Sequence, residues 1–230
     1  MKTENAEYLA NEVVAFLHSP KLTRFTRSLR YALYVIVHPF DGFWDLKHEK
    51  RGSMAAAHMI VFMTLMTTLW IKQFSGFLFV KVDWESVNVW SEMAQVLLPL
   101  IIWCVSNWCL TTLFDGLGSL SDVYITTAYA LTPYVLIQIP LIVMSNVITV
   151  DEGALYTFFS SVSIVWCAAL LVIGMMQTHD YTMGKTILAI FASLVGMVII
   201  IVLCLLIFSM TSEAIGYVVT LIREIMVRGA

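Results

Sequence analysis

The sequence predicts an all-α, polytopic integral membrane protein with five transmembrane helices, preceded by amphipathic helices that lie at the membrane interface. Two observations predict this fold class: the composition and the spacing of the charges. Apolar residues make up 60% of the 230-residue chain and charged residues only 13%, against about 45–50% and about 25% in soluble domains. A domain of this size cannot bury such an excess in water. The composition therefore argues against a soluble enzyme, a nucleic-acid-binding protein or a disordered chain.

Five long stretches of the chain contain no Lys, Arg, Asp or Glu. A helix of about 20 apolar residues crosses a hydrocarbon core of about 30 Å, and each stretch is long enough to do so. A helix is the expected form because lipid offers no hydrogen-bond partners to an open backbone. The alternating strands of a membrane β-barrel are not visible. The predicted spans are Gly52–Ile71, Met93–Phe114, Val123–Val150, Gly153–His179 and Thr186–Ser212.

The spans divide the chain into three parts: an N-terminal segment at 1–51, a five-helix bundle at 52–212 and a C-terminal tail at 213–230. Within the tail, the apolar residues of Glu213–Arg228 share one helical face. The tail could lie on the outer surface of the membrane, extend the fifth helix or pair with a partner. The sequence leaves these three arrangements open.

The N-terminal segment contains a basic amphipathic helix at Lys21–Val37. On a helical wheel its apolar residues fall within about 100°, and its cations lie outside that arc. Pro20 suits the first helical position, and Pro39 marks the end. Such a helix can lie in the interface against anionic headgroups, or it can pack across the cytoplasmic ends of the bundle. Both arrangements produce the same pattern.

A second, short helix is predicted from Pro39 onward, with aromatic side chains at headgroup depth. An earlier stretch, Glu4–Leu17, also has a helical apolar pattern but is acidic, so we expect it to face protein or water. The candidate membrane-interface residues of the segment are Lys21, Arg24, Phe25, Arg27, Arg30, Phe40, Phe43 and Trp44.

Three prolines inside predicted spans are expected to bend them: Pro99 in the second span, and Pro133 and Pro140 in the third. A proline frees a backbone carbonyl, which a neighbouring hydroxyl or amide can satisfy. The candidate donors to these carbonyls are Asn107, Thr127 and Thr132. Gln138 and Asn146 are expected to form interhelical hydrogen bonds.

The distribution of basic residues predicts the orientation. The segment 1–51 contains eight of the thirteen Lys and Arg residues. We therefore expect the N-terminus in the cytoplasm and, after five spans, the C-terminus outside. The chain starts with polar and acidic residues rather than a basic and then apolar run, so no cleavable signal peptide is expected.

The spans lack the residues that most intramembrane chemistry needs. They contain no Asp, Glu, Lys or Arg, and His58 is the histidine placed well inside a span. This argues against an ion-coupled carrier acting alone and against a metalloprotease, whose H-E-x-x-H helix is missing. The four cysteines form no C-x-x-C pair, so no disulfide framework or zinc site is indicated. We expect a non-enzymatic protein without a cofactor or metal.

Short motifs between the spans resemble those of the Yip1 family. The glycine-rich turn Leu113–Leu120 precedes Ala128–Tyr134, which has the family's A-Y-x-x-x-P pattern, and Gln177–Tyr181 with Lys185 resembles the loop after the fourth span. The resemblance covers residues 35–210. The Asp-Leu-Tyr-Gly-Pro motif of eukaryotic relatives is absent. The chain is therefore similar to bacterial members, which implies the bacterial cytoplasmic membrane, and the Rab GTPase binding of the eukaryotic members is not implied.

The resemblance implies a cluster of residues from two loops that faces the cytoplasm. We expect this cluster to contact a partner protein, although the glycines could serve only to form a tight turn between helices. The candidate partner-contact residues are Gly116, Gly118, Ser119, His179, Asp180 and Tyr181.

The expected function is that of a membrane scaffold or accessory subunit, which acts through helix packing and loop contacts. Its expected partners are the lipid bilayer, anionic lipids at the basic helix and other membrane protein subunits; no nucleic acid is expected. The alternative is a component of a membrane transporter, for example an accessory subunit of an ABC-type importer or exporter.

Overall fold

The computed structural model describes residues 20–76, 88–113, 116–149 and 152–228. Every regular element within these ranges is a helix. Two helices, α2 (Pro20–Val37) and α3 (Pro39–His48), precede the spans. The junction lies where the sequence predicts it, because Pro39 restricts the residue before it and opens the next helix. The predicted helix at Glu4–Leu17 lies outside the described residues.

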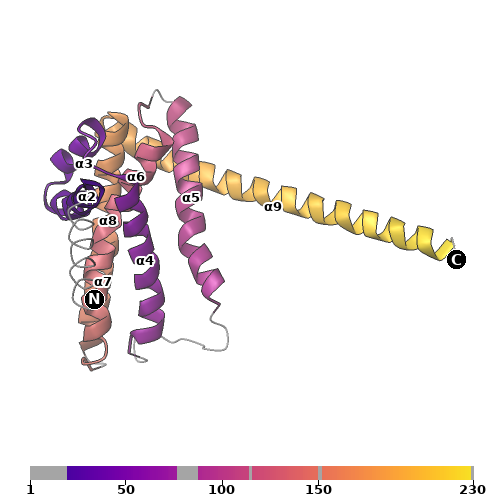
Figure 1. Cartoon of the computed structure of the whole chain (residues 1–230), viewed down its shortest axis with the longest axis horizontal. Helices are drawn as coiled ribbons and strands as arrows, with labels where there is room; N and C mark the ends of the chain where they lie inside the picture. Colours follow the sequence, from indigo (N-terminus) through magenta and orange to yellow (C-terminus); the bar gives the residue numbers. More distant parts are fainter. Residues whose placement is uncertain (1–19, 77–87, 114–115, 150–151, 229–230) are drawn as a thin grey trace, which may run out of the picture.

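Five helical stretches are long and apolar enough to cross a membrane, which confirms the predicted fold class of a multi-pass membrane protein. Figure 1 shows α4, α5 and the pair α7–α8 running alongside one another, with α2 and α3 at one end. The spans are α4 (Met54–Phe74), α5 (Val89–Leu113), α6 (Leu120–Ala130) with α7 (Thr132–Met144), α8 (Gly153–His179) and α9 (Met183–Arg228).

The third span is broken between α6 and α7, at the first of its two prolines. Pro133 has no N–H, so the carbonyl of Tyr129 loses its helical partner. The hydroxyl of Thr132 donates to this carbonyl at 2.7 Å. Thr132 was one of the three residues predicted to donate to a carbonyl freed by proline. Pro99 and Pro140 lie inside helices that continue past them.

The connections alternate between the two ends of the bundle. The α3–α4 junction, the α5–α6 loop and the α8–α9 turn share one end, because Lys47 of α3 contacts Asp180 and Gly118 contacts His179. At the other end, the amide of Asn146 donates to the carbonyl of Phe74 at 2.8 Å. This alternation is expected where consecutive helices run in opposite directions, as α4, α5 and the following spans up to α8 do, whereas α9 crosses the bundle (Figure 1).

Helix α2 packs across the end of the bundle, which is one of the two arrangements expected for it. Its residues Ala32 and Val35 are fully buried. The hydroxyl of Tyr129 donates to the carbonyl of Ser28 (3.1 Å), and the hydroxyl of Ser28 donates to the carbonyl of Arg51 (2.9 Å). These bonds tie α2 to both the third span and the segment that joins α3 to α4.

Phe43 does not lie at the membrane interface with the other aromatic residues of α3, so this expectation was wrong. Its side chain is buried in the core, while Phe40 and Trp44 are about half exposed. Phe40 and Trp44 are four residues apart and share a helical face. Phe43 points instead toward α8, where a Cβ on Gly174 would lie only 3.1 Å from its ring. The absence of a side chain at Gly174 makes room for the phenyl ring.

Helix α9 divides into a packed half and a free half. Its first half packs mainly against α5, with Thr186, Ala189 and Ser193 buried. From residue 201 to 226 every side chain is exposed, and Figure 1 shows this half extending far beyond the other helices. The helix runs unbroken through residues 212 and 213. Of the three arrangements left open for the tail, the structure therefore has the extended fifth helix.

Candidate functional site

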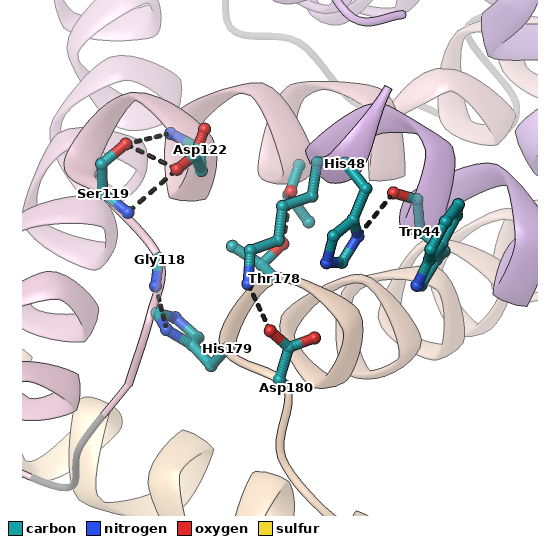
Figure 2. A network of polar contacts seen from close by, with 10 residues as sticks. Trp44, His48, Gly118, Ser119, Asp122, Thr178, His179 and Asp180 are labelled. Carbon is teal, nitrogen blue, oxygen red and sulfur yellow. Dashed lines mark hydrogen bonds and ion pairs between the residues drawn. The ribbon is translucent and has the colours of Figure 1, made fainter. Parts of the chain in front are cut away.

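The α5–α6 loop and the α8–α9 turn meet at the same end of the bundle. Figure 2 shows Gly118 of the loop facing the ring of His179, with Asp180 at the turn that follows. The structure thus brings together the six candidate partner-contact residues, Gly116, Gly118, Ser119, His179, Asp180 and Tyr181.

The imidazole of His179 is buried, and both of its nitrogens have partners. The backbone N–H of Gly118 donates to Nδ1 at 3.3 Å. Nε2 lies 3.0 Å from Oδ1 of Asn107. Because Nδ1 accepts a hydrogen bond, the ring proton is placed on Nε2, which donates to Asn107. A neutral imidazole therefore satisfies both contacts at once.

The network continues from His179 into the last span. Nδ2 of Asn107 donates to the hydroxyl of Ser193 on α9 at 3.2 Å. The neighbouring Ser106 donates to the carbonyl of Ser193 at 2.7 Å. One chain of polar groups therefore joins the α5–α6 loop, α8, α5 and α9, and each buried group in it has a partner.

Gly116 and Gly118 lie so close to the α8–α9 turn that no larger residue fits at either position. A Cβ on Gly116 would lie 2.6 Å from the hydroxyl of Tyr181, and one on Gly118 would lie 2.7 Å from Cε1 of His179. Real Cβ atoms do not approach other heavy atoms this closely. Neither glycine has a positive φ, so space, and not backbone conformation, selects glycine here.

Ser119 ends the loop by capping α6. Its side chain accepts from the N–H of Asp122, and Asp122 accepts in return from the N–H of Ser119 (3.0 Å), which forms a capping box. Two backbone donors at the start of α6 are thereby satisfied. The local sequence thus fixes where the loop ends and the third span begins.

Asp180 and Tyr181 attach the turn to two further elements. Asp180 has a left-handed backbone (φ 54°) after the end of α8, and its carboxylate pairs with Nζ of Lys47 on α3 at 2.7 Å. The Tyr181 ring stacks on His179, and its hydroxyl donates to the carbonyl of Thr111 on α5 at 3.3 Å. Nζ of Lys185 lies 4.5 Å from the centre of the Tyr181 ring.

Exposure separates five of the six residues into two groups, and Gly116 is intermediate. Gly118, His179 and Tyr181 are buried and hold the two loops together, whereas Ser119 and Asp180 are exposed. The side chain of Leu117, between the two glycines, is 70% exposed. A partner at this face would therefore meet Leu117, Ser119 and Asp180, which we call the loop rim.

Sequence reasoning did not connect Asn107, Ser193 and Lys47 to this cluster. Asn107 was expected only to serve a proline-freed carbonyl, but its side chain instead links His179 to Ser193. A polar amide in the middle of an apolar span is the signal that could have suggested a buried network. Lys47 lies 133 residues from Asp180, and nothing local predicts their contact.

The basic candidate interface residues remain at the surface. Arg24, Arg27 and Arg30 are exposed, and Phe25 is partly buried against the core. The side chain of Lys21 lies outside the described residues. The arginines therefore face the solvent or headgroup side of α2, while its apolar face packs on the bundle.

Within the described ranges, no group of three or more His, Cys, Asp or Glu residues could hold a metal ion. All four cysteines are unpaired.

The model of the Yip1 domain family matches residues 33–207 of this chain. No curated protein and no solved structure matches this chain. The matched range contains the loop cluster, the first four spans and the packed half of α9.

Proposed function

Because the chain belongs to the Yip1 domain family, generally a non-enzymatic family of membrane proteins, we propose that it is a non-enzymatic scaffold or accessory subunit. In this role it packs against other membrane protein subunits through its helices. The observation that carries the proposal is a row of small residues on the free half of α9.

The packed half of α9 shows what such a row does in this protein. Ala189, Ser193 and Gly196 recur at intervals of four and three residues and so lie on one helical face. This face packs against α5, and a Cβ on Gly196 would collide with the hydroxyl of Ser106 on that helix. Small residues at this face allow the two helix backbones to approach closely, as they do at many membrane helix interfaces.

The free half of α9 repeats the pattern, and no described segment packs against it. Ser209, Ser212 and Gly216 follow one another at intervals of three and four residues, again on one face. A Cβ on Gly216 would have no neighbour within 4 Å. Large apolar side chains are sufficient for contact with lipid, whereas small and hydroxyl-bearing residues favour contact with another helix. The free half is therefore suited to a membrane-embedded partner helix.

The loop rim is a second contact surface in this proposal. Leu117, Ser119 and Asp180 lie at the end of the bundle that also carries α2 and α3. We place this end in the cytoplasm of a bacterial cell and the C-terminus outside. The supporting observation is the concentration of eight basic residues within 1–51, which favours the cytoplasmic side.

Site-specific photo-crosslinking in intact membranes tests the role of α9. A photoreactive amino acid at Ser212 should crosslink to another polypeptide, and the same probe at Ala214 should not, because Ala214 lies on the opposite helical face. The substitution Gly216→Leu should abolish the crosslink from position 212. The matched substitution Ala214→Leu adds the same side chain off the row and should leave the crosslink intact.

Gly216→Leu cannot act by weakening the helix, because leucine has a higher helix propensity than glycine. Equal crosslinking in both variants would contradict the proposed surface. A purified chain that runs alone and carries a solute across liposome membranes would instead favour the transporter alternative and overturn the scaffold role.

A further inference from the structure

A basic cleft lies between α2 and the residues that join α3 to α4. Its volume is about 770 Å³. Four of its lining residues are cationic, namely Arg24, Arg27, Lys50 and Arg51, and the acidic lining residue is Glu49. A neighbouring cleft of about 720 Å³ shares Arg27 and Arg51 and adds Arg30. The two clefts therefore form one basic surface along α2.

Among the described residues, carboxylates neutralise only part of this charge. Arg51 pairs with Glu49 at 2.5 Å and with Asp45 at 3.3 Å. The other cations make no ion pair with a described residue; they are Arg24, Arg27, Arg30 and Lys50. Guanidinium groups gathered in this way match the geometry and charge of a phosphate group.

Hydrogen bonds across the cleft hold its two walls in place. The hydroxyl of Ser28 donates to the carbonyl of Arg51 at 2.9 Å, and the hydroxyl of Tyr31 donates to Asp45 at 2.8 Å. The guanidinium of Arg51 lies 5.6 Å from the centre of the Tyr31 ring. Burial, together with the adjacent Asp45, raises the pKa of Tyr31, so the phenol stays protonated as a donor. The cleft is therefore preformed.

An apolar groove adjoins this basic surface. It has a volume of about 370 Å³ and lies between α2, α4 and α7, where Leu29, Ile60, Met63 and Leu136 line it. Arg30 lines both this groove and the second basic cleft. A charged pocket and an apolar groove thus share two lining residues of α2, Arg30 and Leu33.

We propose that this composite site binds an anionic phospholipid, with the headgroup phosphate in the basic cleft and an acyl chain in the α2–α4–α7 groove. A phosphate group alone would fill the cleft and leave the groove without a function. A lipid matches both parts, because its charged headgroup is joined to apolar acyl chains just as the basic cleft adjoins the apolar groove. The site does not depend on the α9 surface proposed above.

Native mass spectrometry of the full-length protein in mild detergent tests this site. The probes are phosphatidylglycerol, phosphatidylcholine with the same acyl chains, and inorganic phosphate as a competitor. Wild type should prefer phosphatidylglycerol over phosphatidylcholine. The double variant Arg24→Gln/Arg27→Gln should weaken phosphatidylglycerol binding by about tenfold or more, because charge-assisted hydrogen bonds are lost. Arg223→Gln removes a distant charge from α9 and should have no effect.

Leu136→Trp tests the groove separately. Leu136 is 45% exposed, so a larger side chain can be accommodated while it obstructs the groove, and phosphatidylglycerol binding should fall severalfold. If Leu136→Trp has no effect and millimolar phosphate displaces phosphatidylglycerol fully, the cleft is a free-anion site and the lipid assignment is wrong. Equal binding of the two lipids, or equal losses in Arg223→Gln and the double arginine variant, would also overturn it.

Lys50→Gly provides a variant that keeps the fold. Lys50 has a φ of 50°, a conformation that glycine adopts without strain. The substitution should therefore preserve folding while it weakens phosphatidylglycerol binding severalfold. Unchanged binding in Lys50→Gly together with unchanged binding in the double arginine variant would exclude the cleft as the headgroup site.

Discussion

The backbone N–H of Gly118 donates to Nδ1 of His179 across 3.3 Å, and this bond joins two loops that are 61 residues apart in the chain. The second nitrogen of the same ring contacts Asn107 in the middle of α5. His179 is therefore a structural link between the α5–α6 loop and three spans. Its burial means that it shapes the loop rim without being part of it.

Replacing His179 should destabilise the fold. His179→Ala leaves the N–H of Gly118 and Oδ1 of Asn107 without the partners that His179 supplies, and each unsatisfied buried group costs about 1–3 kcal/mol. We expect a clear fall in the unfolding temperature of the detergent-solubilised protein. His58→Ala is the matched control, because His58 is exposed, its hydrogen bond goes to the carbonyl of Met54 within its own helix, and its ring makes an edge contact with Tyr124. Equal unfolding temperatures for the two variants would contradict the structural role.

A methyl group at Gly118 should also be destabilising. The Cβ in Gly118→Ala would overlap the His179 ring, and such overpacking costs about 1–3 kcal/mol. Gly184→Ala is the control, because a Cβ there meets nothing within 4 Å and the change to alanine within a helix should stabilise by about 0.5–1 kcal/mol. Thermal unfolding should therefore shift in opposite directions for the two variants. If the unfolding temperatures of both variants shift in the same direction, lack of space for a Cβ is not the reason for glycine at position 118.

The two phenylalanines of α3 should differ sharply in their contribution to stability. Phe43→Ala removes a buried ring beside Gly174 and should cost about 3–5 kcal/mol. Phe40→Ala removes a side chain that is about half exposed and should change the unfolding free energy by about 0.5 kcal/mol or less. Denaturant titration of both variants in the same detergent measures the difference. Similar losses would place Phe40 and Phe43 in the same environment, against the structure.

Lys50→Gly should raise the stability of the protein. A left-handed backbone costs a residue with a Cβ about 1–2 kcal/mol, and glycine removes most of this strain. The unfolding temperature should therefore rise, although the basic cleft loses a cation. Lys47→Gly is the contrasting variant: Lys47 lies within α3 and pairs with Asp180, so glycine there should lower the unfolding temperature. A fall in both variants would show that position 50 carries no strain.

The larger features of the fold follow from the sequence because they depend on composition and short-range pattern. Charge-free stretches near the length of a bilayer predict the spans. Pro39 predicts the α2–α3 junction, and Thr132 was among the donors expected near the proline breaks. These features involve residues within a few positions of one another, so local geometry is sufficient.

The candidate site was only partly predictable. The resemblance of the two loops to a known family indicated residues that the structure brings together, but it did not show which of them are buried. Exposure of Leu117 and burial of His179 depend on how α5, α8 and the α5–α6 loop pack. The same limitation explains the error at Phe43, since a helical wheel for α3 shows an aromatic face without showing Gly174 opposite it.

The sequence alone determined that this protein has five stretches long and apolar enough to cross a membrane, because length and composition are sufficient to decide this. It also determined the basic face of α2. The tertiary structure decided which polar groups meet, since the contacts of His179 with Asn107 and of Lys47 with Asp180 span 72 and 133 residues. It also decided that α9 packs with only its first half. Such contacts depend on shape complementarity between helices that are distant in sequence, and no periodicity within one helix encodes the partner it will meet.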